Sequence, residues 1–207
     1  MEEIKAAYDR WARGYDAEEN RTRNLDQKVM AEYEDLFDDA VVLECGCGTG
    51  KNTAMIAQRC LKVVGIDFSE QMLAVAGEKL SGDNVVFLQQ DLNEPWMIED
   101  GVVDTVVFNL VLEHIEDLKH VFSEAMRVLK DGGGLLISEY HPQKQAEGKG
   151  AKFMGQGGAE EKIPFFPHTA DDFAKAAEPL GFEFMELNDW TAEGEDEPRV
   201  LSMLFVK

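Results

Sequence analysis

The feature that most constrains the fold is a short apolar run that ends in a glycine-rich turn. Val41-Val42-Leu43 is apolar and mostly β-branched, Glu44 follows it, and glycine then occupies positions 46, 48 and 50. Residues 52–59 return to helix-like spacing of apolar side chains. Glycines so placed let the backbone turn tightly and approach a ligand closely, while the helix that follows offers its free amide groups. The segment therefore predicts a strand, a ligand-binding turn and a helix.

Apolar runs alternate with helical segments along the rest of the chain. Further strands are expected at 61–66, 85–88, 102–110, 135–138, 182–187 and 200–206. Helices are expected at 2–13, 25–37, 70–80, 118–129 and 170–180, with 16–24 as a loop. Ser69 is expected to cap the helix at 70–80, and Gly132-Gly133-Gly134 to end the one at 118–129. This alternation favours βαβ units, so the fold class is α/β, with a parallel sheet between layers of helices.

Charge and composition exclude several classes of function. The 207 residues include 20 Lys and Arg against 41 Asp and Glu, a net charge of −21, which repels nucleic acid and anionic membranes. No apolar stretch approaches the roughly 20 residues that span a bilayer, and the first residues lack a secretion signal. We therefore expect a cytoplasmic protein. Three cysteines in such a chain are expected to be reduced thiols, and the two inside the glycine-rich turn are packing residues, so no metal site is expected.

Acidic residues follow three consecutive predicted strands. Glu44 ends the first, Asp67 the second and Asp91 the third. Open parallel sheets bind ligands at the carboxyl ends of their strands, where a carboxylate at 67 can accept both hydroxyls of a ribose. Asp91, or the amide of its neighbour, can meet an adenine edge. The dinucleotide pattern Gly-x-Gly-x-x-Gly would need glycine at 51, where this chain has Lys51, which disfavours a pyrophosphate site.

Four motifs together resemble those of the class I S-adenosylmethionine-dependent methyltransferases. They are VVLECGCGTG at 41–50, VGIDFS at 64–69, QDL at 90–92 and NLVLEH at 109–114. The resemblance covers nearly the whole chain. It implies a Rossmann-like, doubly wound sheet of seven strands, mostly parallel with the last antiparallel. It also implies that S-adenosylmethionine lies across the strand ends and that S-adenosylhomocysteine is the product.

The resemblance also implies which residues hold the cofactor. Glu44 would orient the glycine loop and the amino group, Asp67 would hold the ribose hydroxyls, and Asp91 would meet the adenine amino group. The other residues implied in the cofactor site are Gly46, Cys47, Gly48, Gly50, Phe68, Met72, Leu92 and Asn109. The segment 8–16 resembles the lid of small-molecule members, with Tyr15 and Arg23 closing over the cofactor.

Methyl transfer needs alignment, exclusion of water and, for some acceptors, a base for the acceptor's proton. The candidate catalytic residues are His114, His141 and Tyr140, with Glu139 as an accessory. His114 could instead cap a turn. His168 could line the acceptor cavity or only stabilise the end of a loop.

We expect one methyltransferase domain over residues 1–207. It would comprise a helical lid (1–38), a cofactor-binding core (39–140), a substrate-side insertion (141–168) and a carboxy-terminal helix with a strand pair (169–207). The expected function is methylation of oxygen, nitrogen or carbon on a small-molecule acceptor by a monomer or homodimer. The alternatives are a regulatory protein that binds S-adenosylmethionine or a nucleotide without turnover, a protein or peptide methyltransferase, and an NAD-linked oxidoreductase.

Overall fold

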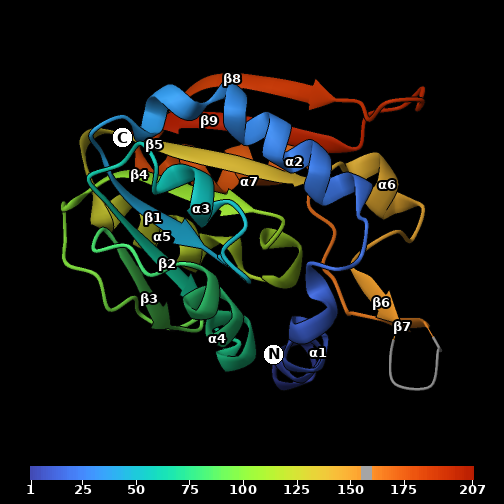
Figure 1. Ribbon diagram of the computed structural model, residues 1–207. Helices are drawn as coiled ribbons and strands as arrows, with labels where there is room; N and C mark the ends of the chain where they lie inside the picture. The colour runs from blue at the N-terminus through green and yellow to red at the C-terminus, as the bar shows by residue number, and fades with distance from the viewer. Residues whose placement is uncertain (155–159) are drawn as a thin grey trace.

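The computed structural model describes residues 1–154 and 160–207, and a seven-stranded sheet forms its centre (Figure 1). The strands are β1 (Val41–Cys45), β2 (Lys62–Asp67), β3 (Val85–Gln89), β4 (Val103–Asn109), β5 (Leu129–Tyr140), β8 (Glu183–Trp190) and β9 (Val200–Val206). Their order is β3-β2-β1-β4-β5-β9-β8, and only β9 runs antiparallel to its neighbours. The predicted α/β class and the mostly parallel, doubly wound sheet are therefore confirmed.

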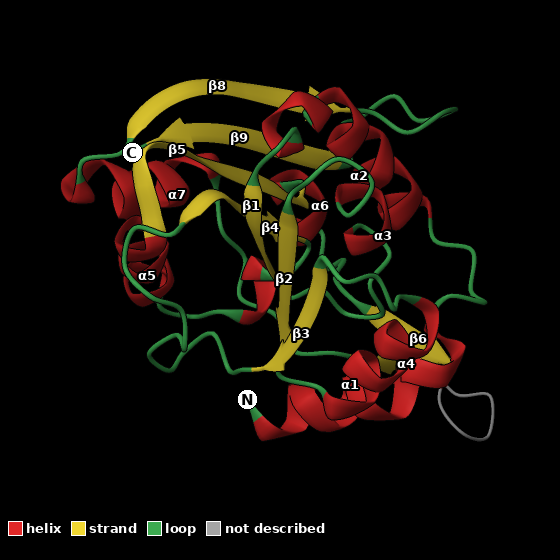
Figure 2. Cartoon of the chain, turned by 60° about the vertical axis from the view of Figure 1, so that its left-hand side comes forward, coloured by secondary structure: helices red, strands yellow, loops and turns green. Residues whose placement is uncertain are grey.

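Helices cover both faces of the sheet (Figure 2). The helices are α1 (Glu2–Tyr15), α2 (Arg21–Glu32), α3 (Thr53–Ile56), α4 (Glu70–Lys79), α5 (Leu118–Val128), α6 (Pro142–Ala146) and α7 (Ala170–Ala177). Successive strand residues face opposite layers: Val42 packs in the cluster with α2 and α3, whereas Leu43 packs in the cluster with α5 and α7. Both strand faces are thus buried, as a parallel sheet requires.

The carboxyl edge of the parallel strands is covered by the amino-terminal helices. Helix α1 packs against α4, and both views show the two helices side by side (Figures 1 and 2). Ser69 caps α4 by accepting a hydrogen bond from the Met72 amide, as predicted. The short strands β6 (Lys152–Met154) and β7 (Glu160–Lys162) form a separate two-stranded sheet. Among the described residues, none of the helices combines the length and the apolar composition that crossing a membrane requires.

Several predicted boundaries were wrong. Helix α2 begins at Arg21 rather than at residue 25, because the Asn20 side chain accepts hydrogen bonds from the Thr22 and Arg23 amides and so caps it earlier. It ends at Glu32, and a 3-10 turn covers 34–37. Helix α3 has four residues instead of the eight expected at 52–59.

The glycine run was also misplaced, because α5 ends before it and β5 begins at Leu129. Leu129 pairs with Val103 and Gly134 with Thr105, so the intervening residues form a bulge inside the strand. The last predicted helix ends at 177 and continues as a 3-10 turn over 178–180. The predicted substrate-side insertion, 141–168, contains α6, β6 and β7, and its residues 155–159 lie outside the described residues.

Candidate cofactor and acceptor sites

The glycine turn after β1 lies against the ends of β2 and β4. The amides of Gly46 and Cys47 both donate to the Ile66 carbonyl, at 2.8 and 3.1 Å, which ties the turn to β2. Gly46 has a φ of +73°, and a Cβ atom there would lie 2.4 Å from Val111 Cγ2. This position therefore requires glycine for both conformational and steric reasons.

Asp67 connects the end of β2 to this turn. Its Oδ2 accepts from the Gly48 amide at 2.9 Å, and its Oδ1 accepts from the Ser69 amide at 2.8 Å. The side chain is buried, and burial raises its pKa to about 6, although the two backbone hydrogen bonds act in the opposite direction. Each carboxylate oxygen retains a second lone pair, so the group can accept further hydrogen bonds from a ligand.

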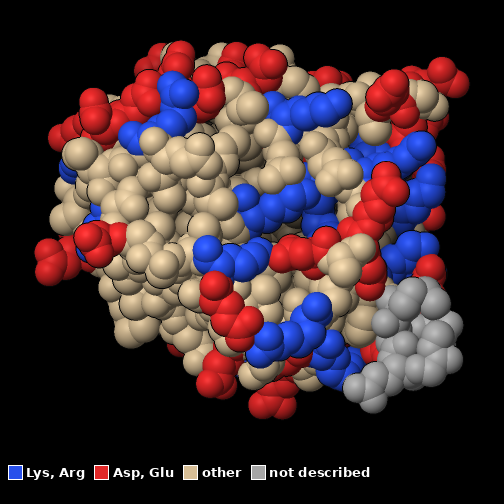
Figure 3. All heavy atoms as spheres, viewed as in Figure 1, with Lys and Arg blue, Asp and Glu red and all other residues tan. Residues whose placement is uncertain are grey.

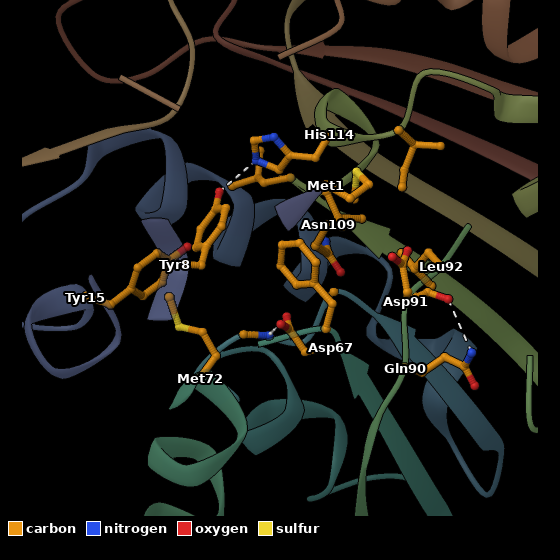
Figure 4. Close-up of a pocket in the computed structure, with 16 residues that line it drawn as sticks. Met1, Tyr8, Tyr15, Asp67, Met72, Gln90, Asp91, Leu92, Asn109 and His114 are labelled. Carbon is orange, nitrogen blue, oxygen red and sulfur yellow. Dashed lines mark hydrogen bonds between the residues drawn. The ribbon is translucent and has the colours of Figure 1, made fainter. Parts of the chain in front are cut away.

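A central cavity opens above the strand ends, and Figure 4 shows the side chains around it. The residues expected from the sequence that line this cavity are Tyr15, Gly46, Gly48, Asp67, Phe68, Met72, Asp91, Leu92, Asn109 and His114. They come from α1, from α4 and from the loops that follow β1 to β4. The structure thus brings together residues up to about half the chain length apart, as the strand-end argument predicted.

A second cavity, here called the loop cavity, adjoins the central one beside the glycine turn. It is lined by Arg23, Glu44 and Cys47 among the expected residues, and by Asp26, which the sequence argument missed. Asp26 is buried and accepts from Asn52 Nδ2 at 2.8 Å, Asn109 Nδ2 at 3.0 Å and Ser138 Oγ at 2.6 Å. Burial raises its pKa despite these three hydrogen bonds.

Hydrogen-bond acceptors predominate on one side of the loop cavity. Glu44 accepts from Thr53 Oγ1 at 2.5 Å, and burial raises its pKa to about 8. Asn109 Nδ2 donates to Asp26 and to Met30 Sδ, and its Oδ1 has no partner among the described residues. Such a set of oxygens suits a positively charged ligand group.

Arg23 supplies a positive charge on the other side of this cavity. Its guanidinium lies 4.0 Å from the centre of the Tyr15 ring and donates to the Tyr15 and Glu18 carbonyls. The side chain is buried, and within the described residues it forms no ion pair with a carboxylate. A buried guanidinium of this kind is suited to an anionic ligand group.

A third cavity, here called the outer cavity, lies beneath the amino-terminal helices and shares Tyr8, Tyr15 and Leu110 with the central one. Tyr140, expected at the acceptor side, lines it, as does Glu113. Its wall also includes the basic residues Arg21, Arg23, Lys152 and Arg199. Figure 3 shows basic side chains gathered on this face of a chain whose net charge is −21.

Tyr8 and His114 lie between the central and outer cavities. The Tyr8 hydroxyl donates to His114 Nε2 at 2.8 Å, because His114 Nδ1 carries the proton that it donates to the Pro164 carbonyl at 3.1 Å (Figure 4). Burial lowers the pKa of His114 to about 4, so this imidazole is neutral at pH 7. This hydrogen bond links α1 to the loop after β4, although Tyr8 and His114 are 106 positions apart in the sequence.

Leu110 lines all three cavities and follows the last residue of β4. Its φ of 51° lies in the left-handed region, which is uncommon for a side chain of this kind. Backbone strain of this sort costs about 1–3 kcal/mol and is concentrated at functional sites.

Two histidines considered from the sequence lie elsewhere. His141 accepts from the Gln143 amide and so caps α6, and its Nε2 donates to Asp189 at 3.2 Å. His168 Nε2 donates to the Ile115 carbonyl at 2.7 Å. As far as the described residues define the three cavities, neither histidine lines them, and Gly50 does not either.

Comparison with known proteins agrees with this geometry. Residues 43–137 match the family described as methyltransferase domain. The uncharacterized methyltransferase AN0656 of Emericella nidulans is 28% identical over 219 residues, covering 88% of this chain and 76% of the fungal one. The ubiquinone biosynthesis O-methyltransferase of Pseudomonas aeruginosa is 30% identical over 154 residues, covering 73% and 62%. This chain contains a methyltransferase domain.

The structure of DhpI in complex with S-adenosylhomocysteine is similar in fold to this methyltransferase. The two align with a TM-score of 0.72 and 23% identity, over 99% of this chain and 95% of DhpI. The methyltransferase domain and the fold expected from the sequence are thus confirmed. The chain spans about half the length of several other curated relatives that it matches.

Proposed function

We propose that this methyltransferase transfers the methyl group of S-adenosylmethionine to oxygen, nitrogen or carbon of a small-molecule acceptor. The observation that carries the proposal is the meeting of three cavities at Tyr15 and Leu110. The residues of the central cavity suit the adenosine half of the cofactor, and those of the loop cavity suit its methionine half. The outer cavity then provides room for an acceptor next to them.

The adenosine half fits the central cavity. Phe68 and Met72 supply apolar surfaces on either side of an adenine, and Asp67 has free lone pairs for two ribose hydroxyls. Asp91 uses its Oδ1 to accept from Asn93, which leaves Oδ2 for the adenine amino group, while the Leu92 amide lies next to it.

The methionine half fits the loop cavity. Glu44, Asp26 and the Asn109 carbonyl oxygen present acceptors to an ammonium group. Arg23 presents donors to a carboxylate from the opposite wall, including an Nε that has no partner among the described residues. The opposite charges of the amino-acid group thus meet complementary walls.

The reaction requires little beyond alignment of the acceptor with the methyl group and exclusion of water, because the sulfonium of the bound cofactor supplies an activated methyl group. Tyr8 and His114 close the central cavity from the side of α1 and hold the lid to the core. Tyr140 is positioned to contact the acceptor in the outer cavity. His141 acts only indirectly, by fixing the start of α6.

A small-molecule acceptor is supported by the outer cavity, which adjoins the central one, and by the Pseudomonas aeruginosa relative, which is named for ubiquinone biosynthesis. The net charge of −21 supports the absence of a nucleic-acid substrate. The proposal includes action in the cytoplasm without a membrane partner, as a monomer or homodimer, with residues 1–207 forming one methyltransferase domain.

A screen with methyl-labelled S-adenosylmethionine tests the proposal. Purified protein is incubated with panels of phenols, carboxylic acids and amines, and S-adenosylhomocysteine formation and labelled product are both measured. Turnover that depends on an added small molecule is expected. Tight cofactor binding without turnover on any panel would indicate the regulatory alternative, and labelling of added peptides alone would indicate a peptide methyltransferase.

A further inference from the structure

Glu113 is a buried carboxyl group beside the junction of the central and outer cavities. It belongs to the 3-10 helix over Leu112–His114, is 6% exposed and lines the outer cavity. Its Oε2 has no hydrogen-bond partner among the described residues, and its Oε1 lies 3.7 Å from His114 Nε2. A polar atom so buried and so unpartnered requires an explanation.

Burial of an unpaired carboxylate is unfavourable, so such a group is retained where a proton or a ligand compensates it. Burial raises the pKa of Glu113 to about 7, and the Gln145 amide acts weakly in the opposite direction. Both the protonated and the ionised forms are therefore available near neutral pH. That is the property required of a group that takes up a proton and releases it in every cycle.

The neighbouring groups are less suited to this task. Both nitrogens of His114 are engaged, by the Tyr8 hydroxyl and the Pro164 carbonyl. Burial raises the pKa of Tyr8 well above 10, so its hydroxyl stays protonated. Glu139 Oε1 accepts hydrogen bonds from the amides of Val111 and Leu112. Among the described residues that line the three cavities, Glu139 does not occur.

We propose that Glu113 is the general base of the methyl transfer and that the acceptor therefore carries an O–H or N–H group. The inference rests on the proposed function and limits its acceptors to molecules that carry an O–H or N–H group. The acceptor's proton moves to the Glu113 carboxylate, and the electron pair that it leaves forms the bond to the methyl carbon. The carbon–sulfur bond breaks with its electrons returning to sulfur, which leaves S-adenosylhomocysteine, a methylated acceptor and a protonated Glu113.

Several charged or titratable groups face Glu113 from the elements packed around it. Those of the outer cavity and its surroundings are Tyr8 and Tyr15 from α1, Glu19 from the loop after it, Arg21 and Arg23 from α2, Glu139 and Tyr140 from β5, Lys152 from β6, and Arg199 before β9. The charge of Glu113 raises the pKa of Glu139, so these two carboxyl groups interact. Glu113 is the buried carboxyl group among the described residues that line this cavity.

The test compares Glu113→Gln with the wild type and with Glu116→Gln, a matched change at an exposed position of the same segment. For an acceptor found in the labelled-donor screen, kcat/KM of the wild type is expected to rise with pH through an apparent pKa near 7. Glu113→Gln is expected to lose about 100-fold or more of kcat and to lose this pH dependence. Glu116→Gln is expected to match the wild type.

Two further readouts separate a catalytic role from a structural one. The Kd of Glu113→Gln for S-adenosylmethionine is expected to stay within about twofold of the wild type, which shows an intact cofactor site. Carbon-13 NMR of the labelled glutamate carboxyls is expected to show one group, absent in Glu113→Gln, that titrates near pH 7.

Each outcome discriminates between the two proposals. Wild-type protein that methylates no acceptor overturns the proposed function and the base with it. Wild-type turnover that Glu113→Gln retains, a Glu113 titration at ordinary acidic pH, or methylation only of acceptors that lack O–H and N–H overturns the role of Glu113 alone.

Discussion

Replacement of Asp67 by alanine tests the adenosine half of the cofactor site. In the free protein each carboxylate oxygen accepts one hydrogen bond from a backbone amide. Each oxygen keeps a second lone pair for a ribose hydroxyl. Hydrogen bonds to a charged group contribute about 1.5–3 kcal/mol. We expect a total loss in this range, because water can replace part of the contact once the carboxylate is gone. The Kd for S-adenosylmethionine should therefore increase about 10- to 150-fold.

Isothermal titration calorimetry measures this change for the wild type, Asp67→Ala and Asp83→Ala, the last at an exposed position before β3. The titrations are made well below the melting temperature, because Asp67→Ala also releases the Gly48 and Ser69 amides and is expected to be less stable. Asp83→Ala should bind like the wild type. A folded Asp67→Ala protein whose Kd lies within twofold of the wild type would refute the ribose assignment.

The other predictions concern protonation, the glycine turn and α6. Binding of S-adenosylmethionine at pH 7 should release protons, because a cationic ligand lowers the pKa of Glu44 from about 8 and so favours its ionised form. Calorimetry in phosphate and Tris buffers measures this release; equal enthalpies in the two buffers would show that no proton is released. Gly46→Ala should weaken cofactor binding at least about tenfold, since its Cβ would overlap Val111 and costs more than 1.4 kcal/mol, whereas Gly77→Ala, with open space around it, serves as the control. His141→Ala should lower the free energy of unfolding by about 1 kcal/mol through loss of a helix cap and leave the cofactor Kd unchanged; a weaker Kd would place this residue in the site.

Much of the fold was predictable because local and global signals agree. The β-branched runs, the glycine turn and the Ser69 cap each favour the structure that tertiary packing also favours. The predicted element boundaries were wrong where a local sequence pattern is compatible with two structures. Gly132-Gly133-Gly134 reads as a helix end, yet the run forms a bulge because Leu129 already pairs with Val103.

The positions of the candidate cofactor residues at the strand ends were predictable for a topological reason. Parallel strands bring their carboxyl ends to one edge, so Glu44, Asp67 and Asp91 had to lie close together. Asp26 was not predictable in this way, because its place depends on how α2 packs against Ser138 of β5. Tyr8 stood within the lid-like segment, but only the hydrogen bond to His114 across the chain distinguishes it from a packing residue.

The pattern in the site residues explains why a strongly acidic chain suits this cofactor. Asp26, Glu44 and Asp67 are buried around the cavities with raised pKa values, and each would be stabilised as a carboxylate by a cationic ligand. The same groups offer no advantage to a polyanionic dinucleotide. We therefore expect the site to favour S-adenosylmethionine over NADH by charge as well as by the shape of its glycine turn.

Calorimetric titration of the purified protein with S-adenosylmethionine, S-adenosylhomocysteine and NADH tests this assignment most directly. The structure predicts one site per chain for the first two ligands and no measurable binding of NADH at the same concentrations. Binding of NADH alone would contradict the assignment of the cofactor cavities.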